Sequence, residues 1–309
     1  MRVAVTGARG RLGRALVAAF EEAPFVGPAG PIAWDRDAFD LDAPGDIGGL
    51  IDRDRPEVVV HAAAWTDVDG CARDPDLAIA RNATATGVLA EACARAGLDL
   101  IVISTNEVFD GRRTDGRGYG PGDPTNPPNA YGASKLAGER AARAAYGREG
   151  GGPSADGAIG IVRTAWLFGP PGNDFPAKIL AAAERAASTR ERLRLVADET
   201  GSPTYAVDLA EAIVELIGEA GIEGVHHLVN GGAVSRAGWA RELLRRARIE
   251  VATQDVPAST WTRASTPPAW SVLEATPLPS GEPMRPWQDA LADYLPTLLR
   301  QRASVGSRP

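Results

Sequence analysis

Short apolar runs alternate along the first half of the chain with longer segments in which apolar residues recur every three or four positions. The apolar runs cover residues 3–6, 31–34, 58–61, 98–104 and 159–164. Runs of this length are typical of buried strands, and the three-to-four spacing is typical of amphipathic helices. The alternation predicts an α/β protein with a doubly wound, Rossmann-type parallel sheet.

The helices of this first half are expected at residues 12–20, 45–54, 76–96 and 131–146. After Trp166 the alternation loosens. Strands are expected at 193–196 and 225–229, and helices at 172–187, 207–217, 235–246 and 287–299. Residues 251–285 are rich in Pro, Ser and Thr and predict a loop-rich lobe, 150–157 a flexible turn, and the tail after Arg300 disorder.

A glycine-rich turn joins the first expected strand to the first helix. Its glycines, Gly7, Gly10 and Gly13, form a GxxGxxG pattern. In a strand–turn–helix context Gly7 permits a tight turn, Gly10 lets the backbone approach a pyrophosphate, and Gly13 lets helix and strand pack closely. The helix then offers unpaired N–H groups to phosphates, so the pattern predicts a dinucleotide site.

Asp35 and Arg36 follow the second expected strand, where the ribose of a bound adenosine would lie. An acidic residue there binds a 2′-hydroxyl, and a neighbouring arginine holds a 2′-phosphate. Both types are present, so NADH and NADPH stay open, with Arg36 favouring NADPH.

Tyr131 and Lys135 lie four residues apart and therefore one turn apart on one helix face. Lys135 and Lys178 are the lysines of a chain that otherwise uses arginine. An ammonium beside a tyrosine stabilises the phenolate, which makes the tyrosine a usable acid near neutral pH. A plain surface pair is the alternative interpretation of this spacing.

The ends of the third and fourth strands add further candidates. Small residues follow His61 and leave room for a flat ligand, whereas His61 itself is interpreted as a core histidine. Thr105 ends the fourth strand, where its hydroxyl can bond a substrate carbonyl beside Tyr131 or simply cap the strand. Asn82, on the expected helix 76–96, either lies on the surface or braces the site.

Composition narrows the function classes. The net charge of −7 argues against a nucleic-acid surface, and no apolar run approaches the ~20 residues that span a bilayer. Cys71 and Cys93 form no disulfide framework, and the histidines have no metal-ligand spacing. We therefore expect a cytoplasmic protein with buried thiols, no membrane partner and no metal site of its own.

The motifs together resemble the extended short-chain dehydrogenase/reductase superfamily and, within it, the dTDP-4-dehydrorhamnose reductase family. The resembling stretches span nearly the whole chain and are residues 7–13, 62–69, 104–111 (STNEVFDG), 129–139 (NAYGASKLAGE), 163–166, 172–175, 198–208 (DETGSPTYAVD) and 268–273. On this basis residues 1–165 are expected to form a dinucleotide-binding domain to which 193–229 return. Residues 166–309 then form mostly a smaller substrate-binding lobe, without a clean linker.

The resemblance implies NAD(P)H-dependent reduction of the 4-keto group of a nucleotide-activated deoxysugar, dTDP-4-dehydro-L-rhamnose, in dTDP-rhamnose biosynthesis. It implies that Tyr131, Lys135 and Thr105 are catalytic and that Asn106 and Trp166 contact the sugar. It also implies that these residues line the cofactor: Gly10, Arg11, Leu12, Asp40, Leu41, Ala63, Ala64 and Trp65. A magnesium-bridged dimer is associated with some relatives, but no residue set here indicates the metal, so monomer and homodimer both stay open.

Two departures from the family pattern bear on the substrate. Asn106-Glu107 stands where the family usually has Asp-Tyr, and Gly70 stands where it usually has a lysine. An epimerase or dehydratase of nucleotide sugars on the same scaffold is therefore an alternative, although a dehydratase needs an acid–base pair at this strand end and the sequence supplies one acid. A non-catalytic, NADP-binding regulatory subunit is a second alternative, which the intact Thr105, Tyr131 and Lys135 disfavour.

Overall fold

The computed structural model describes residues 1–148 and 156–306, with side chains up to Arg302. The turn expected at 150–157 therefore lies largely outside the described residues, as does the end of the tail at 307–309.

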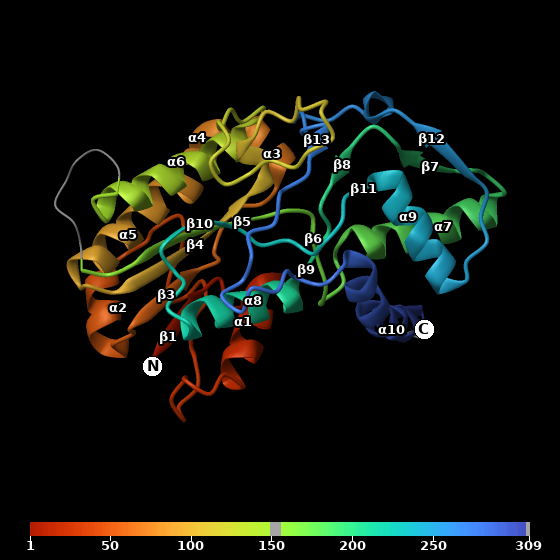
Figure 1. The fold of residues 1–309 in the computed structure, drawn as a ribbon. Helices are drawn as coiled ribbons and strands as arrows, with labels where there is room; N and C mark the ends of the chain where they lie inside the picture. The colour runs from red at the N-terminus through yellow and green to blue at the C-terminus, as the bar shows by residue number, and fades with distance from the viewer. Residues whose placement is uncertain (149–155, 307–309) are drawn as a thin grey trace.

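The largest element of the fold is a six-stranded parallel sheet in the order β2-β1-β3-β4-β5-β10 (Figure 1). Its strands are β1 Val3–Thr6, β2 Ile32–Trp34, β3 Val58–His61, β4 Asp99–Thr105, β5 Ile159–Thr164 and β10 Gly224–His227. The order reverses between β1 and β3, which is the position where open α/β sheets bind ligands. The predicted doubly wound α/β fold is confirmed.

Helices cover both faces of this sheet (Figure 1). On one face lie α1 Arg11–Glu21 and α8 Ala206–Gly218, which share an apolar core with the inward side chains of β1 and β3. The other face carries α2 Ile47–Asp54, α5 Ala85–Arg95 and α6 Ala130–Ala145. Because both faces are covered, most strand side chains are buried and apolar, although His61 in β3 and Arg163 in β5 are buried polar exceptions.

The helix expected over 76–96 is a composite. A separate helix, α3 Val68–Arg73, precedes it, and α4 Pro75–Ile79 continues through a π-helical turn at Ala80–Thr84 (η1) into α5. Asp74 accepts a hydrogen bond from Leu77 N, and Pro75 occupies the first helical position, so the break before α4 is encoded locally. The π turn follows from no local sequence signal.

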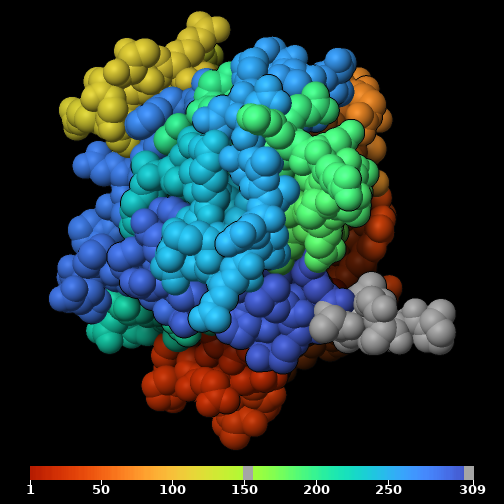
Figure 2. Space-filling model, turned by 90° about the vertical axis from the view of Figure 1, so that its right-hand side faces the viewer, coloured from red at the N-terminus to blue at the C-terminus, as the bar shows by residue number. Residues whose placement is uncertain are grey.

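A smaller lobe packs against the carboxyl end of the sheet (Figure 1). It contains α7 Phe175–Thr189, α9 Arg236–Ala247 and α10 Trp287–Gly306, which surround a second apolar core. Figure 2 shows this lobe face-on, with the segments of α7 and α9 side by side. The helix α10 ends seven residues beyond the expected residue 299, so the prediction of disorder directly after Arg300 was wrong for residues 301–306.

The remaining strands form small sheets in and beside the lobe. They are β6 Leu167–Phe168 with β9 Thr204–Tyr205, β7 Leu193–Val196 with β12 Thr253–Val256, and β11 Val234–Ser235 with β8 Thr200–Gly201 and β13 Trp270–Ser271. Short 3-10 turns lie at Asn106–Val108 (η2) and Ala258–Thr260 (η3). The strand β12 lies inside the range expected to be loop-rich, because its pairing partner β7 is distant in sequence.

The range 193–229 divides between the two parts of the molecule. The helix α8 and the strand β10 lie with the large sheet, whereas β7 pairs with β12 in the lobe. The chain thus crosses between sheet and lobe several times, and pieces from both build the walls of the groove at the sheet's carboxyl edge.

Candidate active site

Two adjoining clefts of about 340 and 550 Å³ follow the carboxyl edge of the sheet from β2 to β5. Gly7, Gly10, Ala62 and Ala64 line both, so the clefts form one groove. The structure brings all the residues expected in the site to this groove. The smaller cleft is lined by Asp35, Arg36, Asp40, Leu41, Ala63 and Trp65, and the larger by Arg11, Leu12, Gly13, Thr105, Asn106, Tyr131, Lys135 and Trp166.

The glycine turn forms the floor between the two clefts. Gly7 has φ +65°, and a Cβ on it would lie 2.8 Å from the Ala63 Cα. A Cβ on Gly13 would lie 2.1 Å from the Gly7 carbonyl oxygen. Side chains at these positions would therefore fill the turn. The first helical N–H groups of α1 receive no side-chain cap from Gly10, so they remain available to a ligand.

Tyr131 lies in the first turn of α6. Asn129 begins this helix by accepting a hydrogen bond from Gly132 N at 2.9 Å. Thr105, the last residue of β4, lies close enough to the Tyr131 hydroxyl to influence its pKa. Burial raises the pKa of Tyr131, the Glu107 carboxylate adds to the rise, and Thr105 opposes it. Lys135 is not among the causes, so the expectation that its ammonium lowers the Tyr131 pKa was wrong. The phenol is therefore protonated at neutral pH and ready to donate.

Lys135 lies one turn further along the same face and is only 3% exposed. Among the described residues no hydrogen bond or ion pair holds its ammonium group. Its natural partner one turn on, Glu139, is engaged by Arg163 through two hydrogen bonds of 3.0 and 2.7 Å and by the Ser104 hydroxyl. Burial lowers the pKa of Lys135 to about 8, while the charge of Glu139 acts in the opposite direction.

His61 is a core histidine, as interpreted from the sequence. Its Nδ1 lies 2.8 Å from the Thr6 hydroxyl and its Nε2 3.0 Å from the Thr86 hydroxyl. Burial lowers its pKa to about 3, and the charge of Lys135 adds to the effect. The imidazole ring is therefore neutral at pH 7, and it is part of the buried core next to the groove.

Asn82 braces the site rather than lying on the surface. It is 1% exposed and sits on the π turn η1. Its side chain accepts a hydrogen bond from Trp65 N at 2.8 Å and donates to Trp65 O at 3.0 Å and to the Ser134 hydroxyl at 3.1 Å. One amide thus links the loop after β3 to the helix that carries Tyr131 and Lys135.

Trp166 lies just after β5 with φ +44°, a strained conformation for a tryptophan. The Arg236 guanidinium lies 3.6 Å from its ring centre, and Trp239 stacks on it with ring centres 5.8 Å apart. A Cβ on Gly201 would meet the ring edge at 2.5 Å, so the lobe holds the indole tightly. Sequence reasoning missed Arg236, because the lobe alone brings it from α9 into the cleft.

At the opposite end of the groove, arginines and aspartates are interleaved. Arg9 contacts Asp35 at 2.5 Å, and Arg36 bonds Asp40 at 3.3 Å and Asp42 at 3.0 Å. Arg81, from η1, bonds the same Asp42 at 2.5 Å. The cleft is also lined by three residues that the sequence did not indicate, Arg9, Asp42 and Arg81. Arg81 lies in the π turn η1, which sets the helical register there and which the sequence does not predict.

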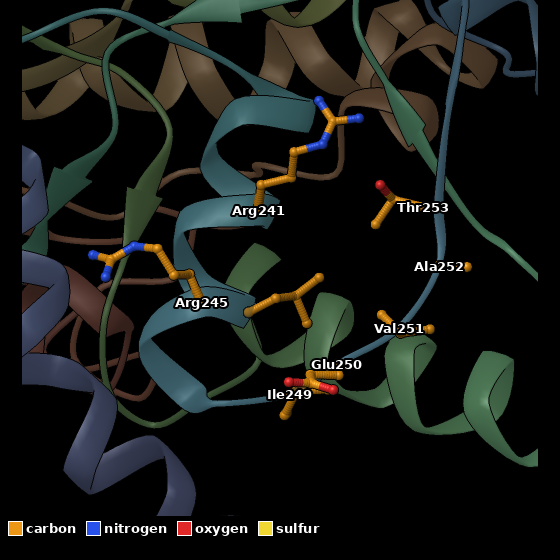
Figure 3. A pocket seen from close by; sticks show the side chains of 8 residues that line it. Arg241, Arg245, Ile249, Glu250, Val251, Ala252 and Thr253 are labelled. Carbon is orange, nitrogen blue, oxygen red and sulfur yellow. The ribbon is translucent and has the colours of Figure 1, made fainter.

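A separate hollow of about 540 Å³ lies between α9 and the segment that leads into β12 (Figure 3). Its arginines are paired: Arg241 with Asp255, and Arg245 with Glu242 at 2.7 Å. None of the residues expected in the site lines it, so we assign it no role.

Other structural findings concern cysteines, metals and membranes. Cys71 and Cys93 are buried free thiols, as expected. Within residues 1–148 and 156–306, no three His, Cys, Asp or Glu residues gather in a way that could hold a metal ion. Over the same described ranges, none of the helices has both the length and the apolar character to cross a membrane.

Comparisons with known proteins agree with this architecture. The model of the RmlD substrate binding domain family matches residues 1–300. The chain is 38% identical over 302 residues to dTDP-4-dehydrorhamnose reductase of Mycobacterium tuberculosis (strain ATCC 25618 / H37Rv), covering 95% of this chain and 92% of that protein. It is 33% identical over 299 residues to dTDP-4-keto-6-deoxy-D-glucose reductase of Streptomyces niveus, covering 95% and 96%.

Among solved structures, the fold resembles dTDP-4-dehydrorhamnose reductase of Bacillus anthracis, determined in complex with NADP. The TM-score is 0.82 at 30% sequence identity, and the match covers 96% of this chain and 99% of that one.

Proposed function

The chain belongs to the RmlD substrate binding domain family and is homologous to NAD(P)H-dependent dTDP-4-dehydrorhamnose reductases, and from this premise we propose that it reduces dTDP-4-dehydro-L-rhamnose to dTDP-L-rhamnose with NADPH. The observation that carries the proposal is that a protonated Tyr131 and a buried Lys135, whose ammonium has no ion-pair partner among the described residues, line the same larger cleft. A structural ion pair would use that charge, whereas here it is free to act on a ligand.

The residues present fit a dinucleotide. The glycine turn offers a cradle that side chains at Gly7 and Gly13 would fill, and the uncapped N-terminus of α1 points unpaired N–H groups to the same place. The pyrophosphate would be held there. The adenosine would lie in the smaller cleft beside Asp35 and Arg36, with Lys135 near the nicotinamide ribose.

When bound, NADPH supplies the hydride for the 4-keto carbon. Tyr131 donates its proton to the oxygen that becomes an alkoxide, and Thr105, which lines the same cleft, would orient the phenol or the ketone. Lys135, one helical turn further along α6 in the same cleft, would stabilise the phenolate once proton transfer has formed it. General acid assistance of this kind contributes about 10²–10⁴ in rate.

The sugar would occupy the larger cleft, between the end of β4 and the lobe. Asn106 is buried there, and Trp166 is held by Arg236 and Trp239. A positive Arg236 beside the aromatic ring suits an anionic nucleotide sugar. The relatives include reductases named for different dTDP-4-keto sugars, so the choice of dehydro-rhamnose rests on the resemblance of the motifs.

The preference for NADPH rests on Arg9, Arg36 and Arg81 around the smaller cleft. Each is paired with an aspartate, and a 2′-phosphate could replace the carboxylate as the partner of an arginine. The NADP complex of the Bacillus anthracis structure supports the same choice.

The test is NADPH oxidation with dTDP-4-dehydro-L-rhamnose, beside a panel of dTDP-, UDP- and GDP-ketosugars and with NADH as the alternative reductant. We expect Tyr131→Phe to lower kcat by at least 100-fold with little change in NADPH affinity. Equal rates for the variant and the unaltered protein would remove Tyr131 from the mechanism.

A further inference from the structure

A second acid–base group faces the same cleft as Tyr131, and the reduction does not use it. Glu107 lies two residues after Thr105, on the 3-10 turn η2 at the end of β4. It lines the larger cleft together with Asn106 and Tyr131. The sequence left the direction of its carboxylate open, and the structure decides it.

The Glu107 carboxylate is fixed to the helix that carries Tyr131. Asn129 donates from Nδ2 to Glu107 Oε2 at 2.7 Å, and its Oδ1 begins α6 by accepting from Gly132 N. A Cβ on Gly132 would lie 2.0 Å from the Glu107 carbonyl oxygen, so the backbones pack directly together. The Glu107 carboxylate is therefore held in place relative to the first turn of α6, which carries Tyr131.

The other carboxylate oxygen is free to act. Among the described residues, Glu107 Oε1 has no hydrogen-bond partner, and no cation lies within ion-pair distance of the carboxylate. Burial raises the pKa of Glu107, while the Asn129 bond and the charges of Arg236 and Arg263 oppose the rise. A carboxylate that is positioned, partly buried and open on one side is well suited to accept a proton from carbon.

Building on the proposed function, we propose that Glu107 removes and returns a proton at a carbon next to the ketone, so that the site exchanges the α-hydrogen of its 4-keto sugar with water. The C–H bond breaks, its electron pair forms the C=C bond of an enolate, and the proton passes to Glu107. The negative charge moves to the ketone oxygen, where Tyr131 donates a hydrogen bond. Return of a solvent-exchanged proton restores the ketone without net oxidation or reduction.

The exchange proceeds on one face of the sugar. Among the described residues that line the larger cleft, the other carboxylate belongs to Asp174. That side chain accepts hydrogen bonds from Gly169 N at 2.8 Å and Ala177 N at 3.0 Å, where it begins α7. With one available base, the proton returns to the side it left, so we expect exchange with retention of configuration rather than epimerisation.

The experiment incubates the full-length protein with NADP⁺ and dTDP-4-dehydro-L-rhamnose in D₂O and follows deuterium at the carbons flanking the ketone by NMR and mass spectrometry. We expect exchange well above the rate in buffer and a loss of at least ~100-fold in Glu107→Gln. Asp110→Asn is the matched control. The Asp110 carboxylate accepts a hydrogen bond from the Tyr119 hydroxyl at 2.6 Å, and Asp110 is not among the residues that line the larger cleft.

Two results would overturn the proposal: exchange at the buffer rate by the unaltered protein, or undiminished exchange by Glu107→Gln. NADPH oxidation is measured on the same preparation. Oxidation without exchange rejects this inference alone, whereas the absence of both also rejects the proposed reduction. Inversion at the labelled carbon would contradict the single-base arrangement. A melting temperature that rises with NADP⁺ verifies that each variant folds.

Discussion

At the scale of single residues, the site depends on the buried Lys135 ammonium, which has no ion-pair partner among the described residues. Lys135 is buried beside Glu139, but Arg163 occupies that carboxylate. An unpaired buried ammonium destabilises the folded state, since desolvation disfavours its charged form. The cost is tolerated where function requires the charge, which is the usual balance between stability and activity.

We therefore predict that Lys135→Met stabilises the protein while it lowers activity. The pKa of Lys135 falls from 10.5 to about 8 on folding, so its destabilisation is fully present below pH 8 and fades as the pH rises towards 10.5. The free energy of unfolding should increase by up to about 3 kcal/mol at pH 7 and by much less at pH 10.

Chemical denaturation at the two pH values measures this difference. Lys178→Met is the matched control, because Lys178 is exposed on α7. An equal gain at both pH values, or a gain from both substitutions, would mean that the Lys135 charge is not the cause.

At the scale of elements, the position of α6 decides the geometry of the site. A Cβ on Gly138 would lie 2.4 Å from the Asn82 carbonyl oxygen, so α6 packs directly on the π turn η1. Asn82, from the same turn, bonds both Trp65 and Ser134. Helix, turn and loop thus form one assembly, and the π turn is placed where such irregularities often serve a site.

Gly138→Ala should push α6 away from η1 and displace Tyr131 and Lys135 together. We expect a loss of about 1–3 kcal/mol in the free energy of unfolding and a fall of at least tenfold in kcat, measured by denaturation and by NADPH oxidation.

Gly87→Ala on the facing helix α5 is the control. Among the described residues its added Cβ would meet the Ala141 Cβ alone, at 3.3 Å, and alanine favours the helix by up to about 1 kcal/mol. A similar loss in both variants would show that the close approach at Gly138 is unimportant.

At the scale of the whole molecule, one groove has two ends that belong to different parts of the chain. The arginines of the smaller cleft come from the loops and helices around β1 to β3, whereas Arg236 comes from the lobe. Cofactor and sugar binding should therefore respond separately to substitutions at the two ends.

Arg36→Ala tests this separation. If Arg36 binds a 2′-phosphate, its replacement should raise the KM for NADPH about tenfold. A factor of this size corresponds to the free energy lost with one charge-assisted hydrogen bond. The KM values for NADH and for the sugar should change little in steady-state assays.

Arg95→Ala, at an exposed arginine on α5 whose ion-pair partner among the described residues is Glu91 at 3.7 Å, should leave all three KM values unaltered. A parallel rise in the KM for NADH after Arg36→Ala would show that the arginine does not recognise the phosphate.

What the sequence by itself determined was local. The apolar runs specified the strands of the central sheet, the glycine spacing specified the turn at Gly7, and the four-residue interval placed Tyr131 and Lys135 on one helix face. These features depend on neighbouring residues and on the periods of strand and helix, so they are visible without tertiary structure.

Only the tertiary structure decided which distant groups meet. It turned Asn82 inward through the π turn, brought Arg236 onto Trp166 from seventy residues away, and aimed Glu107 into the cleft while Arg163 drew Glu139 away from Lys135. Pairings such as β7 with β12 and hydrogen bonds such as Asn129 with Glu107 join separate segments. They follow from packing of the whole chain, for which no single stretch of sequence carries a signal.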